Sequence, residues 1–230
     1  MGGLGTLLEV LYSAHSTSLH VELRDLVYPA PDEGLVVKLD ETGRTDQLRW
    51  SGAGPWPEPT LTSRELWFSP PGRLRVELRH GDVLVRFGVR DGMQWWRWDH
   101  QHGTTSGRVT EEAAHARFPP FLAPPLLAPA QLIPMLGLEP LGLGRRAGRD
   151  VLIARAWLRQ QPKDKEQMRY ELEFDAEYGT MLRHEAFRGL SRIQLTEALA
   201  ITYGCMIEPA RFSFRDPEEA SEHSAPHPRA

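Results

Sequence analysis

Four short runs of alternating apolar and polar residues follow one another between positions 64 and 99, and they constrain the fold more than any other feature. The runs RELWFS, RLRVELR, DVLVRFGV and MQWWRWD are separated only by SPPG, HGD and an Asp91-Gly92 turn. An apolar residue at every second position is typical of a strand with one buried face. Parallel strands need crossover connections of a dozen or more residues, for which there is no room here. The sequence therefore predicts an antiparallel meander.

The same periodicity predicts strands on both sides of this meander. Leu19, Val21 and Leu23 alternate with polar residues, and a turn-prone PAPDEG precedes a further run. Before them, leucines at positions 4, 7, 8 and 11 have helical spacing and predict a short helix that ends near His15. The other expected strands cover residues 35–39, 151–159, 169–175 and 180–187, and a long run near 193–207.

Residues 111–143 break the strand pattern and are rich in both proline and leucine. A flexible linker would be polar, whereas these leucines and phenylalanines need a surface to pack against. We therefore expect a helical insertion, split into short pieces by its prolines, that covers the sheet. The expected organisation is one domain over residues 1–215, with 111–143 as its insertion and 216–230 as a charged, disordered tail.

Composition excludes several classes of protein. The 230 residues carry a formal net charge of −4 without a basic cluster, so neither nucleic acid nor anionic lipid surfaces are favoured partners. Cys205 is the only cysteine and is expected in the core of a strand. The first residues lack a basic region before their apolar part, and no stretch reaches the ~20 apolar residues of a membrane span. A cytoplasmic protein without integral membrane segments is expected.

Few residues suggest catalysis or metal binding. His100 and His102 lie two positions apart in WDHQHG, where both side chains of a strand would share one face and could bind a metal with Asp99. A turn or sheet-edge role is the favoured interpretation, because no second cluster has ligand spacing. The signatures of serine hydrolases, nucleotide-binding loops and zinc hydrolases are absent. Glu171 and Glu173 alternate with apolar residues, which favours a solvated face over acid-base chemistry.

Large aromatic residues crowd the central strands. Trp67 and Phe68 lie in one strand, and Trp95, Trp96 and Trp98 lie in another. Aromatics on both faces suit either a sheet covered on both sides or a concave sheet that holds an apolar ligand. Ordinary core packing is the default interpretation.

Several of these segments together resemble the LolA/LppX/RseB-like superfamily of bacterial lipoprotein carriers and lipid-binding proteins, in its form from GC-rich bacteria. The resemblance rests on RELWFSPPGRLRVELRHG, VRDGMQWWRWD, the hairpin in ELEFDAEYGTMLRHEAF and the strand AGRDVLIARAWLR. It spans roughly residues 4–214. It implies a mainly β (α+β) fold in which a strongly curved antiparallel sheet forms an incomplete barrel, with an N-terminal helix and a helical lid over an apolar concave side. By analogy, Arg75 corresponds to a motif arginine that anchors the lid or a ligand head.

These observations lead to three hypotheses about function. The leading one is a non-catalytic protein, without a cofactor, that holds a hydrophobic or amphiphilic ligand such as a lipid between sheet and lid. The second is a regulatory scaffold with a filled core and a protein partner, and the third is an enzyme that uses His100, His102 or a strand carboxylate on an apolar substrate. Residues expected to contact the ligand are Trp67, Arg75, Trp96, Trp98, Phe121, Leu126, Leu132, Ile133 and Leu136.

Overall fold

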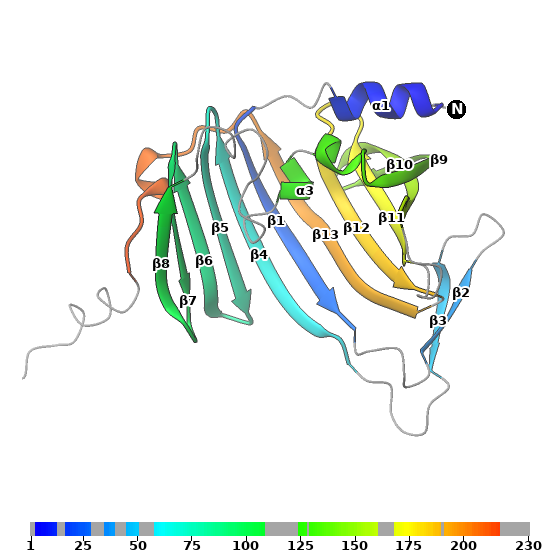
Figure 1. The fold of residues 1–230 in the computed structure, drawn as a ribbon, viewed down its shortest axis with the longest axis horizontal. Coiled ribbons are helices and arrows are strands. Elements are labelled where there is room, and N and C mark those ends of the chain that lie inside the picture. The colour runs from blue at the N-terminus through cyan, green and yellow to red at the C-terminus, as the bar shows by residue number, and fades with distance from the viewer. Residues whose placement is uncertain are drawn as a thin grey trace, which may run out of the picture.

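One antiparallel sheet of eleven strands dominates the computed structural model of the chain (Figure 1). The structure describes residues 3–12, 17–28, 35–39, 45–50, 58–108, 124–127, 129–160, 168–189 and 191–216, with only the backbone for 35–39, 45–50, 124, 125 and 131. The spatial order is β8-β7-β6-β5-β4-β1-β13-β12-β11-β10-β9. Its two end strands do not pair with each other, so the sheet stays open.

Two meanders meet at the centre of this sheet. The first contains β4 (Thr60–Ser69), β5 (Arg73–His80), β6 (Val83–Asp91), β7 (Gln94–Asp99) and β8 (Gly103–Arg108). The second contains β9 (Leu136–Arg146), β10 (Arg149–Leu158), β11 (Met168–Asp175), β12 (Met181–Arg188) and β13 (Ser191–Tyr203). Strand β1 (Leu19–Val27) pairs with β4 on one side and β13 on the other. A separate two-stranded sheet pairs β2 (Leu35–Leu39) with β3 (Thr45–Trp50).

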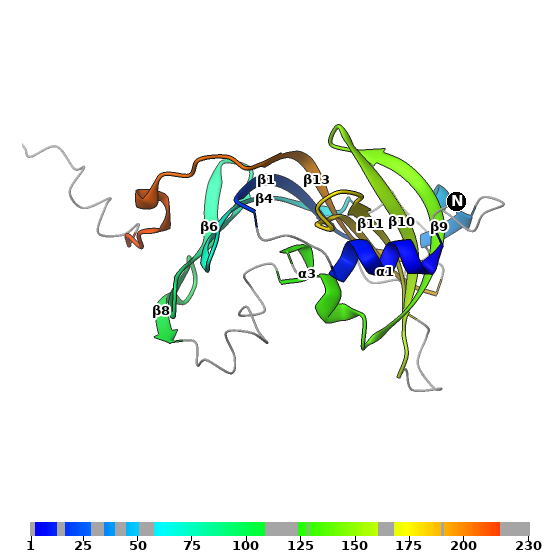
Figure 2. The ribbon, with the colours of Figure 1, turned by 90° about the horizontal axis from the view of Figure 1, so that it is seen from above.

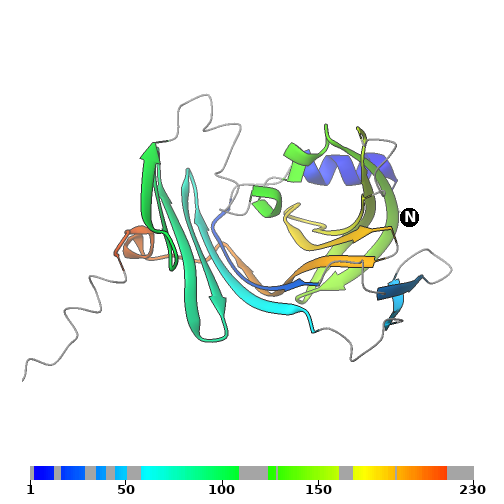
Figure 3. The ribbon, with the colours of Figure 1, turned by 60° about the horizontal axis from the view of Figure 1, so that its bottom comes forward.

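The sheet curves strongly, and its two sides carry different elements (Figures 2 and 3). Helix α1 (Leu4–Tyr12), the short helix α3 (Pro124–Leu127) and the 3₁₀ turn η2 (Pro129–Leu132) lie on the concave side. The segment after β13, with the 3₁₀ turn η3 (Pro209–Phe212), runs along the outer side. The predicted incomplete, curved barrel is confirmed. No helix in the described ranges is long and apolar enough to span a membrane.

Alternating apolar residues of the central strands form the core on the concave side. Leu19, Val21 and Leu23 pack with Leu66 of β4, and Leu126 of α3 joins the same cluster. A second cluster lies under α1, where Leu7 and Leu11 are each 1% exposed and pack with leucines of β9, β10 and β11. Burying two leucines contributes about 3–6 kcal/mol, which is enough to hold a helix that is too short to be stable alone.

The predicted insertion is shorter than expected at its C-terminal end. Residues 124–127 and 129–132 are helical as predicted, but residues 136–143 belong to strand β9 and therefore to the sheet. Pro140 is tolerated there because β9 is an edge strand, and its missing N–H falls beside a bulge opposite Ile153 and Ala154. The expected part before residue 124 lies outside the described residues, as does the expected tail after 216.

Cys205 was predicted to lie in the core of a strand, but it lies outside the strands. β13 ends at Tyr203, and the thiol is half-buried in the segment that follows, 3.7 Å from the carbonyl oxygen of Thr202. Gly204, with φ 65°, interrupts the strand, because a left-handed residue cannot continue the pleat. The strand therefore ends inside the run ITYGCMI, earlier than the apolar composition of this run indicates.

Candidate functional site

A cavity of about 470 Å³ lies between the concave face of the sheet and the segment from α3 to the start of β9. From the sheet, its apolar lining consists of Val76, Leu78, Phe87, Leu158, Leu172 and Met181. From the covering segment it consists of Leu126, Leu132, Met135 and Leu136. The short helices position these side chains because prolines at 124, 125, 129 and 134 break the segment into turns. The result is a space with apolar walls on several sides.

One part of the lining is polar. The described side chains there are Arg64, Arg86, Tyr170, His184, Gln194 and Thr196. Asp25 lies behind them, with its carboxylate accepting a hydrogen bond from the Thr196 hydroxyl and lying 3.0 Å from Nη2 of Arg64. The carboxylate is almost fully buried, whereas the Arg64 side chain is 26% exposed. The cavity therefore combines an apolar lining with a small group of hydrogen-bonding side chains.

Burial shifts the protonation of two of these groups. It lowers the pKa of His184 below its usual value, although the negative charge of Asp25 opposes the shift and the positive charge of Arg64 adds to it. Burial also raises the pKa of Tyr170, whose ring centroid lies 5.5 Å from that of His184. At neutral pH both side chains are therefore uncharged hydrogen-bonding groups.

Three of the residues predicted to contact a ligand line this cavity, namely Leu126, Leu132 and Leu136. Ile133 instead packs against the cluster under α1. Phe121 lies outside the described residues. The segment 124–136 is thus beside the cavity, as the hypothesis of a cover requires, with side chains that point both into the cavity and toward α1.

The tryptophans predicted to line the concave side lie on the opposite face. Trp67, Trp96 and Trp98 cluster with Phe87 and with Phe212 of η3. Trp67 follows Leu66, a residue of the concave core, so strand alternation directs its indole outward. These aromatics are buried because the C-terminal segment covers them, a contact between residues more than 100 positions apart that a strand pattern does not reveal.

Arg75 also lies on the outer face, where it anchors the C-terminal segment. Its Nη1 lies 3.3 Å from the carbonyl oxygen of Arg211 and 3.4 Å from that of Ser213, and its Nε donates to Glu77. Burial alone would raise the pKa of Glu77, but hydrogen bonds from Arg75 and Arg79 outweigh it and lower this pKa below its usual value. The predicted anchoring arginine is therefore placed against the C-terminal segment, away from the cavity and the segment over it.

The predicted polar candidates do not converge in the cavity. His100 and His102 are exposed, and His102 Nδ1 lies 3.1 Å from Asp99 in the turn after β7. Glu171 and Glu173 were expected on a solvated face, but they are 2% and 3% exposed. Arginines from neighbouring strands cover such carboxylates, as Arg146 does for Glu173. A face that alternates arginine with glutamate can bury its charges in pairs, which the pattern of a single strand does not indicate.

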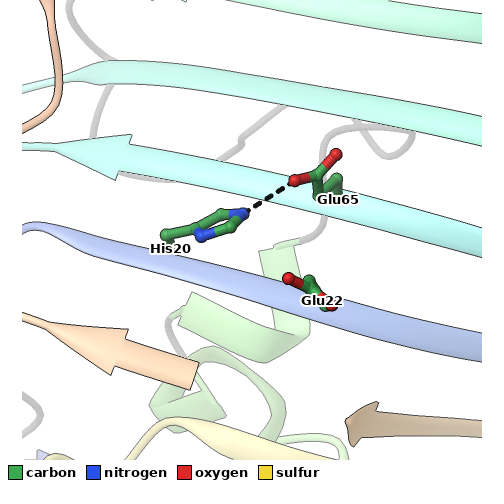
Figure 4. A group of neighbouring side chains, drawn as sticks. All are labelled: His20, Glu22 and Glu65. Carbon is green, nitrogen blue, oxygen red and sulfur yellow. Dashed lines mark hydrogen bonds and ion pairs between the residues drawn. The ribbon is translucent and has the colours of Figure 1, made fainter. Parts of the chain in front are cut away.

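Another group of potential metal ligands was not predicted. His20, Glu22 and Glu65 lie on the outer face of β1 and β4 with their ligand atoms within 4.8 Å of one another (Figure 4). His20 Nε2 is 3.0 Å from Glu65, and its ring stacks on Trp67. Glu22 and Glu65 are direct cross-strand partners, a register that one sequence does not provide. Glu22 is exposed, and exposed acidic groups of this kind are common without an ion.

Comparison with known proteins adds evidence on the fold. No family model matches the chain, and no curated protein matches it. Among solved structures, MucB in complex with MucA(peri) is similar with a TM-score of 0.51 and 16% identity. The Pseudomonas aeruginosa MucA/MucB complex gives a TM-score of 0.52 and 15% identity. Each match covers 92% of this chain and 59% of the other, so the chain spans less than two thirds of the MucB chains. These matches confirm a LolA/RseB-like fold, which the chain shares with MucB.

Proposed function

We propose that this chain is a non-catalytic binding protein that holds a hydrophobic or amphiphilic, acyl-chain-like ligand in the cavity on its concave side. The observation that carries the proposal is the cavity itself, about 470 Å³ in volume with ten apolar residues in its lining. Small-molecule sites typically measure roughly 300–1,000 Å³ and combine an apolar lining with a few polar groups. The volume and the lining both suit one chain-like ligand.

The energetics favour an apolar occupant. Each methylene group transferred from water into such a space contributes about 0.8 kcal/mol, so a chain of several methylenes offsets the cost of association. Segment 124–136 supplies four of these ten apolar residues and would act as the cover. Among the described residues, the histidines and glutamates singled out in the sequence lie elsewhere, which speaks against catalysis by those groups.

A protein partner is a second candidate function. The similar MucB structures are complexes with MucA, and a curved sheet can serve the same role here. A regulatory scaffold would have an interior filled by interdigitated side chains, whereas this chain has an open cavity. Ligand binding therefore remains the leading proposal, and a partner protein would use another face.

Filling the cavity tests the proposal. Leu78 is half-buried in the lining, and replacing it by Trp places an indole in the space that the ligand needs. We expect the Leu78→Trp variant to bind a fluorescent fatty-acid probe at least about tenfold more weakly than the parent chain, which corresponds to ~1.4 kcal/mol. Titration by fluorescence, with native mass spectrometry of the complex, measures the effect.

The matched control is Leu199→Trp, because Leu199 is 54% exposed on β13 and does not line the cavity. This variant should bind the probe like the parent chain. Thermal unfolding of both variants checks that they are folded. Equal probe affinity for Leu78→Trp and the parent chain, or no binding of any acyl probe by the parent, would overturn the proposal.

A further inference from the structure

We infer that the ligand carries an anionic head group, and that Arg64 binds this group inside the cavity with His184 and Gln194 as neighbouring hydrogen-bonding groups. The inference rests on the proposed function, because it assigns the polar end of the same ligand. It follows from the register of the central strands, from the donors that have no partner, and from the balance of charge in the lining.

The register of four neighbouring strands places the polar groups in one row. Asp25 of β1 pairs with Thr196 of β13, and Thr196 pairs with His184 of β12. On the other side of β1, Arg64 of β4 pairs with Leu23 and reaches Asp25 with Nη2. All of these residues except Asp25 and Leu23 line the cavity, so the row crosses its floor.

Some polar groups on the cavity floor have a hydrogen-bond or ion-pair partner, and others have none. Asp25 accepts from the Thr196 hydroxyl and pairs with one nitrogen of Arg64. In the part of the chain that the structure describes, Nε and Nη1 of Arg64, the ring nitrogens of His184 and the amide of Gln194 have no hydrogen-bond partner. A donor in an apolar space costs free energy until water or a ligand accepts its hydrogen bond. The open groups therefore define where the polar end of a ligand binds.

The charge of the lining selects the type of head group. Arg64 and Arg86 both line the cavity, and none of its described lining residues is a carboxylate. Asp25 is buried behind Arg64, while Asp99 is shared by Arg86 and Arg97. The open N–H groups of the Arg64 guanidinium belong to a cation, and charge-assisted hydrogen bonds from them to a carboxylate or a phosphate are about twice as strong as neutral ones. An ester or alcohol would use the same donors without this gain.

Comparing an acid with its own ester tests the inference. Laurate and methyl laurate have the same chain, and only laurate is charged at pH 7.5. Both are titrated against the parent chain by displacement of a bound fluorescent probe. We expect laurate to bind roughly tenfold more tightly than its ester, since a hydrogen bond to a charged group contributes more than one to a neutral group. Lysophosphatidic acid, compared with monoacylglycerol, distinguishes a phosphate from a carboxylate preference.

Arg64→Gln should bring the ratio of acid to ester affinity close to one, mainly because the acid binds more weakly. The matched control is Arg73→Gln, because Arg73 pairs with Asp91 away from the cavity, and it should keep the parent ratio. If Arg64→Gln does not fold because Asp25 loses its partner, the double variant Asp25→Asn/Arg64→Gln removes both charges together. Equal affinity of the parent for acid and ester, or an unchanged ratio in the Arg64 variants, overturns the head-group inference and leaves the proposed function standing. Failure of the parent to bind either compound overturns both.

Discussion

His184 is a residue of the cavity whose burial makes the stability of the chain depend on pH. Its pKa is lowered in the folded chain, chiefly by burial, with Asp25 opposing and Arg64 assisting the shift. The unfolded chain therefore takes up a proton at His184 at a higher pH than the folded chain does. Between the ordinary pKa of about 6.5 and the lower folded value, the unfolded state binds more protons, so the free energy of unfolding falls as the pH falls.

Replacing this side chain should remove that part of the pH dependence. We expect His184→Gln to lose less thermal stability than the parent chain when the pH is lowered from 7.5 to 5, because glutamine does not titrate. The other histidines are common to both proteins, so the difference between the two curves isolates His184. Thermal unfolding followed by circular dichroism at several pH values measures it. Parallel curves for the two proteins would contradict the account.

At the scale of elements, the predictable parts are those whose pattern is local. Alternation in β5, β6 and β11 and helical spacing in α1 indicated these elements directly. β9 was missed because its leucines and Pro140 suggest a covering segment until the edge position is known. The outward placement of Trp67 depends on η3, and the row from Arg64 to His184 depends on register across four strands. Neither the placement of Trp67 nor this row can be predicted from the pattern of a single strand.

Helix α1 gives a direct test of packing at this scale. Leu11 is 1% exposed in the cluster with Leu136 and Leu172, whereas Tyr12 is 68% exposed. We expect Leu11→Ala to lower the free energy of unfolding by about 2–5 kcal/mol through lost burial and the cavity it leaves. Tyr12→Ala should change it by less than about 0.5 kcal/mol. Urea denaturation measures both, and similar values for the two variants would show that α1 does not dock as described.

Considered as a whole, the molecule has one sheet with two faces that are covered in different ways. On the concave face, a cavity lies between the sheet and the segment from α3 to the start of β9. On the outer face, the C-terminal segment closes over the aromatics, with Phe214 stacked on Phe87 and Arg211 over Trp67. The proposed ligand site therefore lies on one face, and the tryptophan-rich face is packed under the C-terminal segment.

Removing the aromatic contact of the C-terminal segment tests this division. Phe212 is 2% exposed and packs in the cluster with Trp67 and Trp98. We expect Phe212→Ala to cost about 3–5 kcal/mol and to shift tryptophan fluorescence to longer wavelength, because water reaches the indoles. Acyl-probe affinity should be unchanged at temperatures where the variant is folded. A large loss of affinity in the folded variant would mean that the two faces are not independent.

Photo-crosslinking with an acyl chain that carries a diazirine tests the central claim most directly. After irradiation of the complex, peptide mass spectrometry locates the modified residues. Adducts are expected on the cavity lining, on β5, on β11 or on segment 126–136, and excess laurate should suppress them. Adducts confined to Trp96, Trp98 and the C-terminal segment, or adducts that laurate does not suppress, would contradict this claim.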